Sequence, residues 1–235
     1  MTVDQIGEMG DFVNDSVATS AMNDAPDADR IRKYDTIKAP TNFMTGIIWC
    51  VSALIIFGTV YLFMRGHWII GLVGVPFSVF AALVSYYALD STSVKEMAYK
   101  DGLLTPAIIV NIDPIELIAM ANMRSSIDGD EIYGCQRLQV ESLPLHSLRL
   151  GERVPCASLF MGTQKGHHKV FNARPVCWGF DDASKIERAI ESISADDDCE
   201  FFDSTWAMLS CVESQMSKQP FGKILFFDER MQLIG

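Results

Sequence analysis

Two long apolar runs in the first half of the chain dominate its hydrophobic pattern. Residues 44–64 and residues 69–89 contain no charged side chain, and a turn of four residues, 65–68, separates them. As an α-helix each run would be about 31 Å long, close to the about 30 Å thickness of a bilayer's hydrocarbon core. We therefore predict a transmembrane helical hairpin over residues 39–90. The alternative is a buried hairpin of a soluble protein, where adjacent charge-free runs of this length are rare.

The charges that flank the two runs predict an orientation. Basic residues precede the first run and follow the second, whereas the turn between them has a single arginine: Arg30, Arg32, Lys33, Lys38, then Arg65, then Lys95 and Lys100. Lysine and arginine favour the cytoplasmic side of a membrane. We therefore expect a two-pass protein of the inner (plasma) membrane with both termini cytoplasmic.

The pattern changes beyond the second run. Residues 91–101 read as a linker, and residues 102–235 as a β-rich domain. The apolar runs "PAIIVNID" and "IELIAMANM" lie at hairpin distance, and the glycine-containing loop "GTQKG" joins two further strand-like runs. Five or six short strands of this kind usually curl into a partly closed barrel, which protects the sheet edges.

Two amphipathic segments near the C-terminus predict helices at about 181–193 and 204–217. Their apolar residues recur at helical spacing, and Asp or Ser precedes each segment as a helix cap. The expected fold is therefore a membrane-anchored α+β fold: a two-helix transmembrane hairpin followed by a small β-barrel-like domain with two C-terminal helices.

Residues 1–38 precede the hairpin. Residues 1–29 contain seven acidic side chains and no basic one, and their low apolar content predicts a flexible acidic tail. The tail is either an inert leader or an arm that docks on a basic partner. The chain's net charge of −11 repels phosphate backbones, so nucleic acid is not an expected partner.

Candidate chemistry is sparse along the chain. The six cysteines form no C-x-x-C pair, and the adjacent His167 and His168 would point apart on a strand. His146 and Ser147 stand outside any nucleophile elbow. We predict no catalytic residue, no cofactor and no metal site. Widely spaced cysteines are also typical of free thiols in a reducing compartment.

Three stretches carry a resemblance to a known family: "PAIIVNIDPIELIAMANM", "LRLGERVPCASLF" and "PVCWGFDDASKIERAIESI". In these, the chain resembles uncharacterised actinobacterial membrane proteins that have a two-helix hairpin and a small cytoplasmic β domain, over roughly residues 40–195. In build it is also similar to accessory subunits of the actinobacterial cytochrome bc–oxidase supercomplex. The resemblance implies no catalytic residues.

These observations predict a non-catalytic accessory or scaffold subunit of an inner-membrane complex, with the respiratory supercomplex as the first candidate. Integral membrane proteins and lipid would contact the hairpin, and the β domain and the tail would cover a cytoplasmic face. The alternative is a membrane-tethered module that binds a ligand or lipid. One face of the second run would contact either the first run or a partner helix, because it consists of small residues. These are Gly71, Gly74, Ser78, Ala82 and Ser85.

Overall fold

The chain is described by a computed structural model and forms two compact units. One unit, the helical hairpin, is Ile37–Lys95; the other, the β domain, combines Met1–Thr36 with Glu96–Gly235. The structure describes residues 22–37, 43–89, 92–125, 131–164, 166–195, 201–202 and 204–234; within the elements, the side chains of residues 43–48, 70–71, 84–89, 92–94 and 164 are outside this description.

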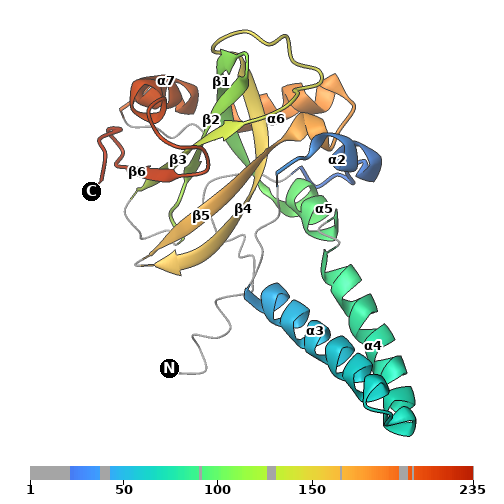
Figure 1. Cartoon of the computed structure of the whole chain (residues 1–235). Helices are drawn as coiled ribbons and strands as arrows, with labels where there is room; N and C mark the ends of the chain where they lie inside the picture. The colour runs from blue at the N-terminus through green and yellow to red at the C-terminus, as the bar shows by residue number, and fades with distance from the viewer. Residues whose placement is uncertain are drawn as a thin grey trace. The chain divides into compact units, whose positions relative to one another are not determined.

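A curled antiparallel sheet of six strands forms the β domain as a half-barrel (Figure 1). The strand order is β5-β4-β1-β2-β3-β6, so each hairpin predicted from the sequence joins neighbouring strands. The strands are β1 (Leu103–Ile112), β2 (Ile115–Asn122), β3 (Tyr133–Gln139), β4 (Arg153–Gln164), β5 (His167–Pro175) and β6 (Ile224–Phe227).

Glycines allow the turn between β4 and β5, and backbone hydrogen bonds pair part of the edge of β5 with the chain that follows β2. Gly162, near the end of β4, and Gly166, in the β4–β5 turn, have φ angles of 64° and 84°, which glycine adopts without steric cost. Beyond β2, the His168 N–H donates to the Met123 carbonyl at 2.7 Å, and the Ser125 N–H donates to the Gly166 carbonyl at 3.0 Å. These bonds connect the chain after β2 to the outer edge of β5, so part of that edge is already paired.

Two amphipathic helices cover the sheet: α6 (Ala183–Ala195) packs on β4 and β1, and α7 (Thr205–Met216) packs on β1, β2 and β3. Both lie within two residues of the helices predicted from the sequence. The Ser204 side chain caps α7 by accepting from the Ala207 N–H at 3.3 Å. The short 3-10 helix η1 (Val176–Trp178) follows β5 and buries all three of its residues.

A third helix of the β domain lies where the sequence predicts a flexible tail. Helix α2 (Ala28–Tyr34) begins after Asp27, whose side chain accepts from the Asp29 and Arg30 N–H groups. Ile31 is fully buried. The composition of residues 1–29 does not predict this helix. A single cap and a single buried side chain are enough to order a short segment against a domain, and neither changes the average composition. Residues 1–21 lie outside the described part of the chain.

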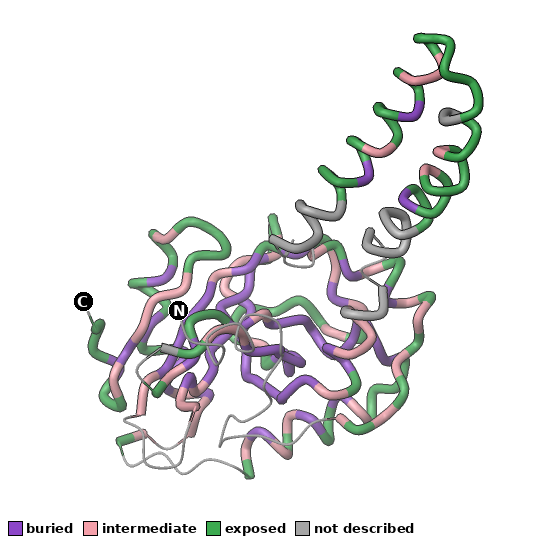
Figure 2. Tube along the Cα trace, turned by 90° about the horizontal axis from the view of Figure 1, so that it is seen from below, coloured by how far each residue is buried: buried purple, intermediate pink, exposed green. Residues whose placement is uncertain are grey.

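The hairpin unit consists of α3 (Phe43–Met64) and α4 (Trp68–Leu89), which pack against each other, and it is followed by α5 (Thr92–Asp101), which leads into β1. Gly66, with φ 80°, makes the turn between α3 and α4. Figure 2 shows that most described positions of α3 and α4 are exposed.

The predicted transmembrane hairpin requires correction. A search of the described residues finds no helix with the length and apolarity that a membrane crossing requires. The prediction of a membrane-anchored fold is therefore wrong on this structure, and so is the two-pass inner-membrane location with cytoplasmic termini.

Candidate functional site

The contact between α3 and α4 is made by hydroxyl groups. Among the described side chains of the hairpin only Ser52, Thr59 and Ala81 are buried. The Thr59 hydroxyl donates to the Ile55 carbonyl at 2.9 Å and accepts from the Ser78 hydroxyl at 2.9 Å. The Ser52 hydroxyl donates to the Ala81 carbonyl at 3.3 Å. Hydroxyl groups that bond across helices in this way allow close packing.

Gly74 fits this contact because it has no side chain. A Cβ atom at this position would lie 2.7 Å from Thr59 Oγ1, which is closer than such atoms approach. The predicted small-residue face, Gly71, Gly74, Ser78, Ala82 and Ser85, is therefore partly placed. Gly74 and Ser78 lie against α3, Ala82 is exposed, and the side chains of Gly71 and Ser85 are outside the described set. A role for this face in binding a partner helix stays a prediction.

The outward surface of the hairpin is strongly apolar. On α3, Leu54 is 73% exposed and Phe57 is 80% exposed; on α4, Leu72 and Phe80 have comparable exposure. Soluble monomers rarely expose a contiguous apolar patch of more than a few hundred Å². The hairpin thus places hydroxyl groups inside and apolar groups outside, the reverse of a water-facing helix pair, and its surface is suited to an apolar partner.

A buried ion pair fastens the residue that follows α2 to strand β5 within the β domain. The Arg174 guanidinium on β5 donates to Asp35 Oδ2, and the Tyr99 hydroxyl on α5 donates to the same oxygen at 3.3 Å. All three side chains are buried. Burial, together with the negative charge of Asp35, raises the pKa of Tyr99 well above its usual value, so the phenol stays protonated and serves as a donor.

Exposed ion pairs hold the rest of the arm that contains α2 (residues 22–36). Arg30 contacts Asp181 at 2.5 Å and donates to the Cys177 carbonyl at 2.9 Å, while Lys185 contacts Asp24 at 3.0 Å. Reasoning from the sequence missed this arm, because its partners are far away in the chain. The Asp27 cap was the one local signal that could have indicated it.

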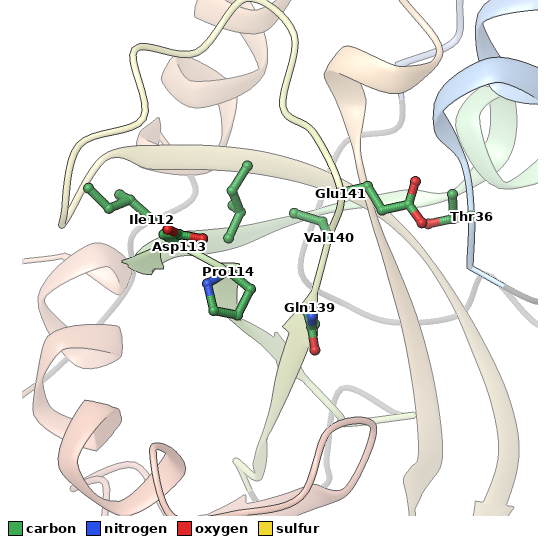
Figure 3. A pocket seen from close by; sticks show the side chains of 8 residues that line it. Thr36, Ile112, Asp113, Pro114, Gln139, Val140 and Glu141 are labelled. Atoms are coloured by element: carbon green, nitrogen blue, oxygen red, sulfur yellow. The ribbon is translucent and has the colours of Figure 1, made fainter.

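An open cavity of about 600 Å³ lies beside the β1–β2 turn (Figure 3). Its lining combines apolar residues of the turn with acidic and amide side chains. No basic residue lines it, and neither carboxylate in the lining forms an ion pair within the described part of the chain. The lining residues are Thr36, Ile112, Asp113, Pro114, Ile115, Gln139, Val140 and Glu141.

The loop between β3 and β4 is fixed by one carboxylate. Glu152 accepts from the Ser147 N–H and hydroxyl at 2.9 and 2.7 Å and from the Arg149 N–H at 3.1 Å, and it contacts His146 Nδ1 at 3.1 Å. This partner of His146 was not predicted from the sequence. Glu152 thus bonds to the serine as well as to the histidine and stabilises this turn. The absence of a catalytic role for these residues stays a prediction.

The titration of this group follows from its surroundings. Burial lowers the pKa of His146 below its usual value, although the bond to Glu152 acts in the opposite direction. Burial alone would raise the pKa of Glu152, but the hydrogen bonds from Ser147, Arg149 and His146 outweigh it and lower that pKa. Both residues therefore favour the forms present at neutral pH, a neutral imidazole and a carboxylate.

Other candidate ligands and nucleophiles are dispersed. His168 is buried against the Phe160 ring, with centroids 5.1 Å apart, whereas His167 contacts Phe226 at 5.7 Å. Burial raises the pKa of the Cys177 thiol to about 12, which makes it a poor nucleophile. Within the described ranges, no three His, Cys, Asp or Glu side chains converge as a metal would require. The absence of a metal stays a prediction.

Comparisons with known proteins identify a family for more than half of the chain. A model of the family described as "Protein of unknown function (DUF3239)" matches residues 91–209, the part from α5 to α7. No match is found among curated proteins. Among solved structures, one described as a "putative membrane protein from Corynebacterium diphtheriae" aligns with a TM-score of 0.41 and 18% identity, covering 53% of this chain and 98% of that chain.

Proposed function

We propose, for a chain that belongs to the DUF3239 family of proteins of unknown function, a non-catalytic role as an accessory subunit of a larger membrane complex. The α3–α4 hairpin would bind apolar helices of an integral membrane protein. The β domain would then be held beside that partner, where it covers part of the partner's polar surface.

The reversed pattern of the hairpin carries this proposal. Its hydroxyl groups bond to each other between the helices, and its large apolar side chains, among them Phe57 and Phe80, point outward. Contact with water is unfavourable for such a surface by about 25 cal/mol per Å² of apolar area. Covering it with helices of similar apolarity removes that cost, whereas the small-residue contact keeps the hairpin itself closed.

The respiratory cytochrome bc–oxidase supercomplex is our first candidate for the partner. This choice rests on the likeness of build drawn from the sequence, and the comparisons with known proteins provide no support for it. Lipid bound between the hairpin and its partner is also compatible with the exposed aromatic side chains of Trp49 and Trp68.

Affinity purification from the native host after extraction in mild detergent tests the proposal. We expect the chain to co-purify in constant stoichiometry with subunits of one membrane complex, identified by mass spectrometry. The double substitution Leu54→Ser and Phe57→Ser should abolish this co-purification, because it removes apolar contact from the exposed side of α3. Circular dichroism should show that the β domain remains folded.

A matched control removes the same kind of side chain from the β domain. Leu150 and Leu233 are 67% and 54% exposed, and Leu150→Ser with Leu233→Ser should leave the complex intact. Loss of the partner from both double variants to the same degree, or purification of the native chain alone, would contradict a hairpin-mediated accessory role.

A ligand-binding module is the second candidate, and the cavity beside the β1–β2 turn favours it. A module of this kind should purify without a partner and gain thermal stability when its ligand is added. An accessory subunit should instead gain stability from its complex. The two roles are therefore separated by one comparison of melting temperatures before and after partner removal.

A further inference from the structure

We propose that the cavity beside the β1–β2 turn binds a cation carried on an aliphatic stem. This is the chemistry of a lysine or arginine side chain and of a free alkyl polyamine. The cavity has a volume of about 600 Å³, within the range of about 300–1,000 Å³ that is typical of ligand pockets. An extended side chain or a short polyamine fits such a volume with room to spare.

Charge is the first argument for a cation. Asp113 comes from the β1–β2 turn and Glu141 from the chain after β3, so the two carboxylates belong to different walls (Figure 3). No lysine or arginine lines the cavity, and the described residues offer neither carboxylate an ion-pair partner. The lining therefore has two negative charges without a balancing charge. It repels phosphates, anionic lipid headgroups and other anions.

The apolar wall is the second, independent argument, and it specifies the stem. Ile112, Pro114 and Val140 line the same cavity, and Ile112 is 49% exposed. A bare metal cation would leave these side chains without contact and would require several oxygen ligands at once. A purely apolar ligand would bury the carboxylates without a partner. A cationic group on a methylene chain satisfies both parts of the lining.

Neutral polar groups complete the site and connect it to the arm. Thr36 and Gln139 present a hydroxyl and an amide, which accept hydrogen bonds from an ammonium or guanidinium group. Thr36 directly follows Asp35, whose carboxylate is fixed by the buried ion pair with Arg174. Thr36 therefore lines the cavity from a position next to a buried ion pair.

The expected affinity is low. Exposed carboxylate–ammonium pairs contribute little individually, and the cavity is open, so a dissociation constant of about 1 mM is the expected order of magnitude. Binding should weaken as salt is added, because both carboxylates are exposed to solvent. This inference does not depend on the accessory role, since it concerns binding by the isolated chain.

Methyl NMR of the full chain, labelled at isoleucine and kept in non-ionic detergent, tests the inference. The probes are spermidine and an acetylated, amidated Leu-Lys-Leu tripeptide, with butanediol as a neutral reference. We expect saturable shifts of the Ile112 and Ile115 methyl signals with at least one cation, and no such shift with butanediol. Ile186 and Ile193, two buried residues of α6, should not respond. Saturation by only one probe identifies the source of the cation.

Two charge-matched variants decide the outcome. Asp113→Asn with Glu141→Gln should weaken binding by about fivefold or more, whereas Glu187→Gln with Glu191→Gln, on the exposed face of α6, should leave it unchanged. Unaltered Ile186 signals establish that both variants are folded. The inference is overturned if neither cation gives saturable shifts, if butanediol gives the same shifts, or if the two double variants behave alike.

Discussion

In the β domain, the largest fully buried side chains include Trp178, Phe160 and Phe171, whereas in the described hairpin the buried side chains are Ser52, Thr59 and Ala81. The two units thus bury different kinds of side chain. The domain buries apolar area away from water, and the hairpin buries hydroxyl groups that bond across two helices. The domain therefore has an apolar core of its own, whereas most described apolar side chains of the hairpin are exposed.

Truncating one phenylalanine in each unit should have the largest and clearest effect. Phe171→Ala empties a fully buried site and should lower the free energy of unfolding by about 3–5 kcal/mol. Phe57→Ala, at an exposed position, should change it by less than about 0.5 kcal/mol. Urea denaturation followed by near-ultraviolet circular dichroism measures both. Equal losses would mean that the hairpin has an internal apolar core after all.

A buried and an exposed ion pair of the arm should differ in their contribution to the free energy of unfolding almost as much as the two phenylalanines. Asp35→Ala leaves the buried Arg174 guanidinium without its carboxylate and should cost about 3–5 kcal/mol. Asp181→Ala removes the exposed partner of Arg30 and should cost at most about 1 kcal/mol. The same denaturation curves give the answer. A small effect of Asp35→Ala would show that the arm does not contribute to the domain's stability.

Two glycines of the hairpin should respond in opposite directions. Gly74→Ala places a Cβ 2.7 Å from Thr59 Oγ1 and should destabilise the α3–α4 contact by about 1–3 kcal/mol. Gly58→Ala meets no atom within 4 Å and should stabilise α3 by about 0.5–1 kcal/mol. Amide hydrogen exchange of α3 and α4, read by mass spectrometry, distinguishes them. Unchanged or slower exchange in Gly74→Ala would contradict the contact at Gly74.

The smallest effect is a pH dependence confined to the β domain. The folded-state pKa of His146 lies below its usual value of 6.5, chiefly through burial. As the pH falls below about 6.5, the unfolded chain therefore takes up this proton first, and stability decreases. His146→Gln should flatten the dependence of the free energy of unfolding on pH below about pH 6.5. A steeper dependence in His146→Gln would reverse the assigned direction.

Local signals in the sequence were enough to predict the β-hairpins and the helices α6 and α7 of the β domain. Turn glycines such as Gly166 and the helical spacing around Ile186 and Leu209 act over a few residues, and the sheet follows from pairing neighbours. The arm was not predictable in this way, because Asp35 and Arg174 are 139 residues apart. Nothing near either residue in the sequence identifies its partner.

The hairpin shows a second limit of sequence reasoning. Its length and apolarity suggested a membrane crossing, which the described helices do not support. Small residues on α4 suggested one packing face, yet Gly74 and Ser78 contact Thr59 while Ala82 remains exposed. The cavity left no local signature, since its lining comes from three separate segments.

The hydrogen bond between Tyr99 and Asp35 also has a consequence for how the chain is connected. The chain leaves the β domain after Thr36 and returns at Glu96, and the 3.3 Å bond holds these two ends together. The hairpin is thus an insertion between two adjacent points of one domain. In a shortened chain, a linker of about six residues, with a reach of about 20 Å, takes the place of the hairpin. Shortening this loop tenfold would reduce its closure entropy by about 2 kcal/mol, so the domain without its insertion should be the more stable folding unit, provided that it keeps the arm.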